Sequence, residues 1–454
     1  MRQHAAFLVA IVFFASALTP AALAVAPEAP VQQQREPART MSYRGAPWLE
    51  RVERVATERP EEVLDAMGLE PGDVVADIGV GSGYFARRIA RRVGPDGKVY
   101  GVDIQPEMLD ILRERARQEG IDNIEPVLGE PDDPKLPPGA IDWMILVDVY
   151  HEISEPAVML ARMRQALAPD GRIALLEYRL EDRTADHIFA DHRMSIRQVL
   201  AEWKAAGFEL VELHEFLPSQ HMFVFRGTRQ GEETGSTSSP ALQDYDLFAA
   251  IDAGLIEVEA RGADREQVRL RIRRRVDGRM VITAPAGTLF QARGESRDMV
   301  ARRDAGILLS EDGWTDWAVR AIGTRSDRPA PGGRERFDLK PAADNAVLGR
   351  VAMAIQAGTY YATREAARSS YVPPSIGVEE AAVWIAEQDP AYDDIAGQIG
   401  DERVPAAHAA ALALALCDRA GIDITQTRMW RDREAIFQQL DVPELTAWYA
   451  SRIR

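Results

Sequence analysis

Short apolar runs alternate with segments of helical periodicity in the first half of the chain. This order is typical of a parallel sheet flanked by helices. The predicted strands are 74–78, 98–103, 124–128, 143–147 and 172–176, and the predicted helices are 84–93, 106–119, 156–167 and 196–206. Two more strand-like runs, 209–216 and 221–225, follow without an intervening helix. We therefore expect an α/β fold with a doubly wound, Rossmann-like, seven-stranded sheet and an antiparallel closing hairpin.

The second half begins with strand patterns and ends with helical ones. Val268, Leu270 and Ile272 alternate with arginines, and Asp277-Gly278 predicts a type I′ hairpin before the run at 280–282. We expect a β-sandwich over 241–340 and a helical region over 341–454. The arginines that alternate with Val268, Leu270 and Ile272 form the opposite face of the strand, which could bind an anionic surface. More commonly, such a face is simply exposed to solvent. The predicted Ala/Leu-rich helix at 406–419 is expected to bury Cys417 in the hydrophobic core of this helical region.

Two stretches lack this periodicity. An apolar run that ends in the small-residue cleavage pattern Ala22-Leu23-Ala24 predicts a signal peptide over 1–24. The stretch after it, 25–40, is predicted to be a flexible spacer. We expect export to the periplasm or outside the cell; the alternative is an uncleaved anchor with a cytoplasmic-facing protein. A Gly/Ser/Thr-rich stretch at 227–240 predicts a linker that ends a first domain at 41–226.

Charge and cysteine content narrow the function classes. The 71 acidic residues exceed the 54 basic ones by 17, so a general nucleic-acid binder is not expected. The single cysteine excludes an internal disulfide framework and a thiolate-rich metal site. His187, Asp191 and His192 do not share one helical face, so no metal site is predicted.

A glycine-rich turn joins the first predicted strand to the first helix after it. Gly79, Gly81 and Gly83 follow Asp77, and Asp103 ends the next strand, where it can accept both ribose hydroxyls of a nucleoside. A dinucleotide fingerprint requires a glycine where Tyr84 stands. The motif therefore indicates a different nucleoside ligand.

Residues 58–226 resemble the class I S-adenosylmethionine-dependent methyltransferases in their glycine motif, in LAPDGRIALLEY at 167–178 and in the closing hairpin. The resemblance implies S-adenosylmethionine as cofactor, with Asp77 and the three glycines around its methionine moiety and Asp103 on its ribose. It places Asp132 at the adenine and Asp148 at the sulfonium and the substrate mouth. The alternative is that these acids cap helices or turns.

The segment after the fourth strand offers the catalytic candidates. His151 is the candidate general base, or else a structural histidine, and Tyr150 is expected to line the acceptor pocket. This segment lacks the Asn-Pro-Pro-Tyr pattern of enzymes that methylate amide or adenine nitrogens. We expect methyl transfer to a small-molecule or lipid-like acceptor, with the C-terminal region contacting a partner or surface. The alternative is an exported, non-catalytic nucleoside-binding or interaction protein that retains the fold.

Overall fold

The computed structural model describes residues 37–228, 242–357, 375–402, 404–440 and 443–452. The predicted signal peptide, most of the predicted spacer and nearly all of the predicted linker lie outside the described residues, so export and these boundaries stay predictions. All of the described residues belong to one compact unit. None of the helices within the described ranges combines the length and the apolar character needed to cross a bilayer.

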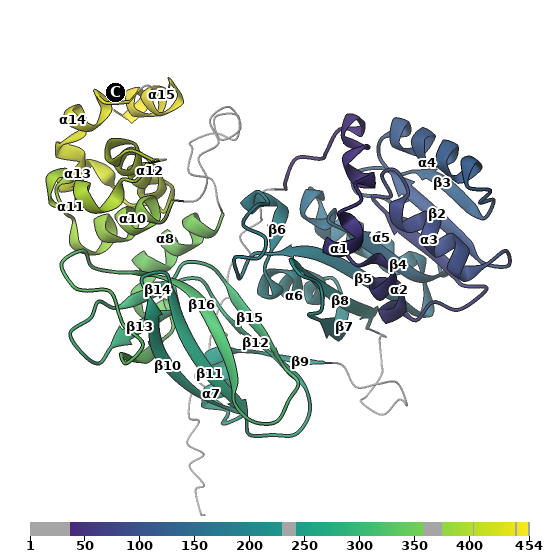
Figure 1. The fold of residues 1–454 in the computed structure, drawn as a ribbon, viewed down its shortest axis with the longest axis horizontal. Helices are drawn as coiled ribbons and strands as arrows, with labels where there is room; N and C mark the ends of the chain where they lie inside the picture. The colour runs from purple at the N-terminus through teal and green to yellow at the C-terminus, as the bar shows by residue number, and fades with distance from the viewer. Residues whose placement is uncertain (1–36, 229–241, 358–374, 403, 441–442, 453–454) are drawn as a thin grey trace, which may run out of the picture. The chain divides into compact units, whose positions relative to one another are not determined.

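The first part of the chain is built on one mixed sheet (Figure 1). Its strand order is β3-β2-β1-β4-β5-β8-β7; β1 to β5 run parallel, and β8 is antiparallel to both β5 and β7. The expected fold and closing hairpin are thus present. A short strand, β6, also pairs with β5 and makes the sheet eight-stranded, which the seven-strand prediction missed. The strands are β1 Val74–Ile78, β2 Lys98–Asp103, β3 Ile124–Leu128, β4 Ile141–Val147, β5 Leu167–Arg179, β6 Arg193–Met194, β7 Phe208–His214 and β8 Gln220–Gly227.

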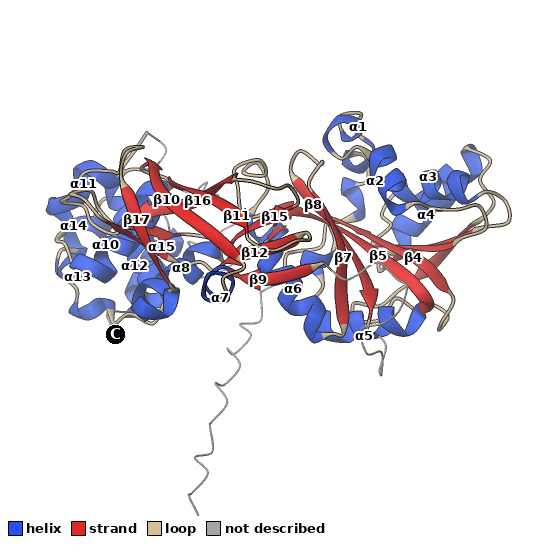
Figure 2. Cartoon of the chain, turned by 90° about the horizontal axis from the view of Figure 1, so that it is seen from below, coloured by secondary structure: helices blue, strands red, loops and turns tan. Residues whose placement is uncertain are grey.

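Helices cover both faces of this sheet (Figure 2). Val75 of β1 belongs to one hydrophobic cluster, whereas Ala76 and Ile78 belong to the other, because successive strand side chains point to opposite faces. The first cluster packs under α2 Pro60–Met67, α3 Tyr84–Val93 and α4 Pro106–Gln118, and the second packs over α5 Pro156–Ala166 and α6 Ile196–Ala205. Ser195 caps α6 by accepting a hydrogen bond from Gln198 N–H at 3.1 Å.

The predicted β-sandwich is wrong, because the strands close into a six-stranded barrel in the order β10-β11-β16-β14-β13-β17. Pairing of β17 with both β10 and β13 closes the ring and leaves no free edge. A separate three-stranded sheet has the order β15-β12-β9. The elements are β9 Gln243–Asp246, α7 Leu247–Asp252, β10 Ile256–Asp264, β11 Gln267–Arg274, β12 Met280–Ala284, β13 Leu289–Ala292, β14 Met299–Ala301, β15 Ala305–Leu309, β16 Thr315–Gly323 and β17 Arg336–Lys340.

The hairpin predicted at Asp277-Gly278 is also wrong. Gly278 does adopt a positive φ of 94°, so the chain turns there. However, β11 pairs with β10 and β16, whereas β12 pairs with β15 and β9 in the other sheet. The arginine face of β11 meets acids across the strand pair, for example Arg273 with Glu257.

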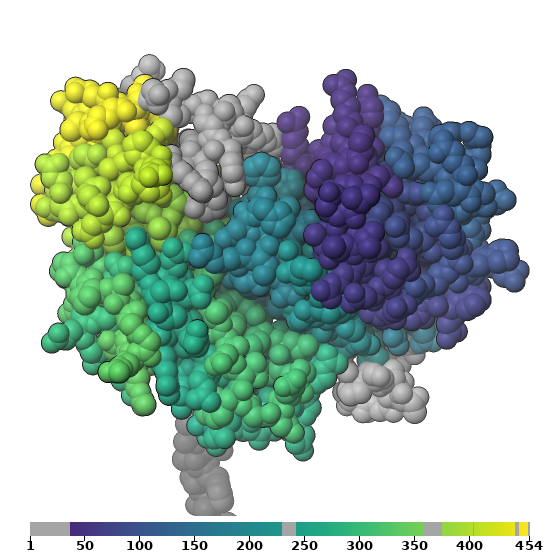
Figure 3. All heavy atoms as spheres, viewed as in Figure 1, coloured from purple at the N-terminus to yellow at the C-terminus, as the bar shows by residue number. Residues whose placement is uncertain are grey.

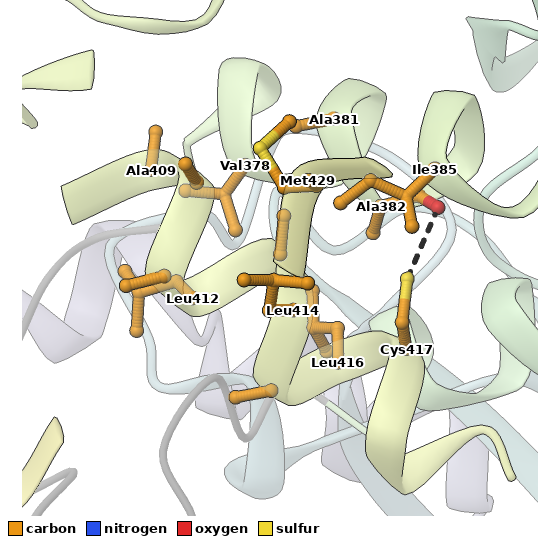
Figure 4. Packing of buried hydrophobic residues seen from close by; sticks show 14 of the residues in the cluster. Val378, Ala381, Ala382, Ile385, Ala409, Leu412, Leu414, Leu416, Cys417 and Met429 are labelled. Carbon is orange, nitrogen blue, oxygen red and sulfur yellow. Dashed lines mark hydrogen bonds between the residues drawn. The ribbon is translucent and has the colours of Figure 1, made fainter. Parts of the chain in front are cut away.

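The C-terminal part is helical, as predicted, and buries the single cysteine. Cys417 is fully buried, its Sγ donates a hydrogen bond to the Ala382 carbonyl oxygen at 3.3 Å, and burial raises the pKa of its thiol (Figure 4). This agrees with the expectation of a structural thiol. The helices are α8 Ala346–Gln356, α10 Ile376–Gln388, α11 Tyr392–Ile399, α12 Ala406–Arg419, α13 Arg428–Arg431, α14 Arg433–Phe437 and α15 Pro443–Arg452.

Candidate functional site

The turn from β1 to α3 has the backbone that its glycines predict. Gly79, Gly81 and Gly83 have φ values of 73°, 52° and 82°, a region that L side chains rarely adopt. A Cβ added at Gly81 would lie 2.7 Å from Leu49 Cδ1. The backbone conformation therefore favours glycine at this position, and any larger residue would also displace the end of the Leu49 side chain.

Two carboxyl groups meet at this turn. Asp77, in β1, is 4% exposed and accepts a hydrogen bond from Ala86 N–H, and burial raises its pKa to about 7. Asp103, at the end of β2, accepts from Gly81 N–H at 3.0 Å and from Gln105 N–H at 2.9 Å. Burial raises the pKa of Asp103 as well. Each acid therefore supports local backbone, as the alternative interpretation expected, yet remains buried beside the glycine turn.

A third carboxyl group, Asp148, follows β4 with a φ of +53°. The Gln220 amide Nε2 donates to both of its carboxyl oxygens at 2.8 Å. Burial and then the nearby carboxylates of Glu58 and Glu177 raise the pKa of Asp148 well above its usual value. The carboxyl ends of β1, β2 and β4 thus bring Asp77, Asp103 and Asp148 to the edge of the sheet where α/β proteins bind ligands.

Two exposed aliphatic side chains lie beside Asp103. Leu128 is the register partner of Asp103 across the β2–β3 pair and is 55% exposed, and Ile104 is 42% exposed. Large apolar side chains exposed next to a buried acid suit the flat face of a base. The sequence analysis missed them, because an aliphatic residue at a strand end has the same pattern as a core residue. Asp132 lies half-buried in the turn after β3.

The chain before α2 covers the glycine turn. This segment contains three short helices: η1 Tyr43–Gly45, η2 Trp48–Glu50 and α1 Arg54–Thr57. Glu50 accepts a hydrogen bond from Ser82 Oγ at 2.6 Å and pairs with Arg87 of α3 at 2.6 Å. In the space-filling view the covering segment is purple and lies against the blue part of the chain that follows it (Figure 3).

Arg54 of this covering segment places a buried cation beside the acids. Its guanidinium lies 4.1 Å from the ring centroid of Tyr84 and pairs with Glu58 at 2.6 Å. Its positive charge counteracts the effect of burial on the pKa of Asp77 and Asp148. From the sequence, Arg54 and Glu58 form an ordinary i,i+4 pair on a helix surface, so no local signal distinguishes them.

The two catalytic candidates after β4 have different surroundings. They belong to the short helix η3 Tyr150–Glu152. His151 is 2% exposed, and its Nδ1 lies 2.7 Å from Glu177 Oε2 of β5. Tyr150 is fully buried, donates its hydroxyl hydrogen bond to Glu202 of α6 at 2.6 Å and packs on Trp203. We therefore assign Tyr150 to the core and correct its prediction as a lining residue of the acceptor pocket.

The segment between β5 and β6 brings another histidine to His151. It contains η4 Ala190–His192, and the ring centroids of His192 and His151 are 5.0 Å apart. His187 instead packs edge-on against Tyr178, with the two ring centroids 6.4 Å apart. Burial and then the negative charges of Asp148 and Glu58 raise the pKa of Tyr178, which places Tyr178 near the acids.

Another histidine, His221, lies between two carboxylates. Its Nδ1 and Nε2 lie 2.9 Å from Glu215 and 3.0 Å from Glu181. These carboxylates outweigh burial and raise the pKa of His221 to about 9. Both ring nitrogens are therefore occupied in holding the closing hairpin, and His221 has no place in the candidate site.

Comparisons with known proteins give the arrangement a context. A family model described as a methyltransferase domain matches residues 69–219. The chain is 33% identical over 113 residues to nocamycin O-methyltransferase of Saccharothrix syringae, covering 25% of this chain and 40% of that one. It is 31% identical over 116 residues to the ubiquinone/menaquinone biosynthesis C-methyltransferase UbiE of Hahella chejuensis, covering 25% and 47%. The chain thus spans less than half of the length of these two relatives.

A solved structure is similar to the same part of the chain. It is a SAM-dependent methyltransferase from Aquifex aeolicus, 25% identical in sequence, with a TM-score of 0.39. The match covers 41% of this chain and 98% of that one.

Proposed function

Residues 69–219 form a domain of the class I S-adenosylmethionine-dependent methyltransferase family, and on this premise we propose that the protein transfers a methyl group to a small-molecule or lipid-like acceptor. Both relatives named above are methyltransferases, one called a nocamycin O-methyltransferase and the other assigned to ubiquinone/menaquinone biosynthesis. Their names support a small acceptor for this chain. S-adenosylmethionine supplies an electrophilic methyl group on a cationic sulfur.

The excess of buried negative charge at the glycine turn carries this proposal. Four buried carboxyl groups, those of Asp77, Asp103, Asp148 and Glu58, gather near two arginines, Arg51 and Arg54, and both arginines pair with Glu58. Burial raises the pKa of all three aspartates. Gathering buried carboxylates is unfavourable unless a positive partner offsets them. A ligand with an ammonium group and a sulfonium supplies that partner, so the residues fit this cofactor.

We assign a different group of side chains to each part of the cofactor. We assign Asp77 to the ammonium and Asp103 to the ribose hydroxyls, since a carboxylate accepts from both types of donor. Ile104 and Leu128 provide the exposed aliphatic surface for the faces of the adenine. Asp132, in the turn after β3, remains the proposed acceptor for the adenine amino group.

The acceptor side is formed by His151 and the segment between β5 and β6. Because Glu177 is a hydrogen-bond acceptor at His151 Nδ1, it holds the ring proton there and makes Nε2 the basic atom. Phe189, which is 54% exposed, adds aromatic surface for an apolar acceptor. We propose that His151 serves to remove the proton of a hydroxyl-bearing acceptor, while Asp148 faces the reacting groups.

A transfer assay tests this function. The full chain, incubated with methyl-labelled S-adenosylmethionine and a panel of phenols, quinols and hydroxylated lipids, is expected to label at least one class. His151→Ala is expected to reduce the rate by about 100-fold or more with cofactor affinity unchanged, because general-base catalysis typically contributes at least that factor. His214→Ala is the matched control, because His214 lies in β7, outside the acceptor segment, and pairs with Glu212. An unlabelled panel, or full activity in His151→Ala, contradicts the assignment.

A further inference from the structure

Three side chains from two distant segments converge on the acceptor side. His151 and Glu152 belong to η3, and His192 belongs to η4, which lies against it. One ligand atom from each residue can be chosen so that all three lie within 4.8 Å of one another. His151 is buried, and Glu152 and His192 are partly buried. Two imidazoles and one carboxylate form a common ligand set for divalent transition metals.

A carboxylate orients each imidazole. Glu177 lies 2.7 Å from His151 Nδ1, and Asp191 lies 2.9 Å from His192 Nδ1. Metal-binding histidines commonly donate one ring N–H to a carboxylate in this way, which fixes the tautomer and raises the basicity of the other nitrogen. The same arrangement at both rings makes Nε2 the ligand atom of each.

The charge around the two rings favours a cation. Three carboxyl groups lie close to the two imidazoles, and they belong to Glu152, Glu177 and Asp191. The Met41 N–H also donates to Glu152 at 3.4 Å, and the Arg39 backbone bonds to His192. A divalent ion at the centre would offset most of the negative charge and replace the contact with the Arg39 backbone.

We propose that His151 Nε2, His192 Nε2 and a Glu152 carboxylate oxygen bind a divalent transition metal such as zinc. Tetrahedral zinc places neighbouring nitrogen and oxygen ligands roughly 3.3 Å apart. Because the three side chains offer ligand atoms within 4.8 Å of one another, they must move closer together when the ion binds. Three protein ligands leave a fourth position open. That position is characteristic of catalytic rather than purely structural zinc sites.

The open position gives the metal a use in the proposed reaction. An acceptor hydroxyl bound there would release its proton to solvent water at a lower pH, because the ion would stabilise the oxyanion. His151 would then be a metal ligand, and the ion would supply the activation of the acceptor that is assigned above to the His151 imidazole. This use rests on the proposed methyl transfer, whereas the metal site stands on the ligand geometry alone.

Metal binding to the full chain tests the site. Protein stripped with a chelator is titrated with Co²⁺ and Zn²⁺, with bound metal measured by elemental analysis and Co²⁺ coordination followed by visible absorption. We expect one ion per chain and visible bands of a low-coordinate cobalt site. His192→Gln and Glu152→Gln are expected to weaken binding at least tenfold, whereas His187→Gln, in the same segment, retains it.

Two results overturn the proposal: a folded wild-type chain that retains no ion, or His192→Gln binding as tightly as wild type. Thermal unfolding of each variant shows whether it is folded. S-adenosylmethionine binding is measured on the same samples, so loss of metal with intact cofactor binding is separated from failure of the methyltransferase assignment. Folded Glu152→Gln provides a second test if His192→Gln does not fold.

Discussion

Asp77→Asn is expected to lose cofactor binding and, at the same time, to make the folded protein more stable. Burial raises the pKa of Asp77 to about 7 from 3.8, so the folded state disfavours the charged carboxylate. The stability associated with the neutral carboxyl is fully present below pH 3.8 and is lost as the pH rises through 7. Asparagine stays neutral and can still accept from Ala86 N–H, so the gain in stability grows as the pH rises above 3.8 and is complete above about pH 7.

The two effects are measured separately. We expect affinity for S-adenosylmethionine to fall by at least about 100-fold, because a charge-assisted bond to the ammonium is lost. We expect the free energy of unfolding at pH 8 to rise by about 1–3 kcal/mol, with a smaller gain at pH 5. Asp110→Asn, on the surface of α4, is the matched control. Wild-type affinity or reduced stability in Asp77→Asn contradicts the assigned role.

Glu379→Gln is expected to be among the most destabilising single substitutions in the second half of the chain. Glu379, in α10, is fully buried and forms ion pairs with Arg302 and Arg303, which are 3% and 1% exposed. Burial already lowers the pKa of Arg303 to about 10. Removing the carboxylate leaves buried guanidinium charge without its main counter-charge, which costs about 3–5 kcal/mol.

Urea unfolding followed by tryptophan fluorescence measures this loss, since Trp384 lies on the same helix and donates to the Gly323 carbonyl oxygen. Glu387→Gln is the control, because Glu387 is exposed on α10 and its replacement is expected to change stability by less than about 0.5 kcal/mol. A similarly small change in Glu379→Gln contradicts the account of this ion-pair network.

The first half of the fold was predictable because its signals are local. Strands β1, β2 and β3 begin and end at the predicted residues, since each contains Val or Ile and has polar or glycine residues at or beside both ends. The positive φ values of Gly79, Gly81 and Gly83 follow from a turn that only glycine accommodates easily. The placement of Asp77 and Asp103 beside that turn follows from parallel pairing of β1 with β2.

What escaped prediction depends on contacts between distant segments. Alternation in β11 is the same in a sandwich and in a closed barrel, and the choice is made by β17, which pairs with β10 and β13. The covering segment contacts the glycine turn through Leu49 and Glu50, which carry no local signal. His192 meets His151 only because the segment between β5 and β6 folds back, so the sequence search for metal ligands compared the wrong neighbours.

Calorimetric titration of the full chain with S-adenosylmethionine tests the central claim most directly. We predict one binding site in the folded wild type, with the demethylated product also binding. Asp103→Ala is expected to weaken binding about 100-fold through loss of two ribose hydrogen bonds to a charged acceptor, and His187→Ala is expected to bind as wild type does. A folded wild-type chain that binds neither compound, or Asp103→Ala with full affinity, would contradict the assignment of this pocket.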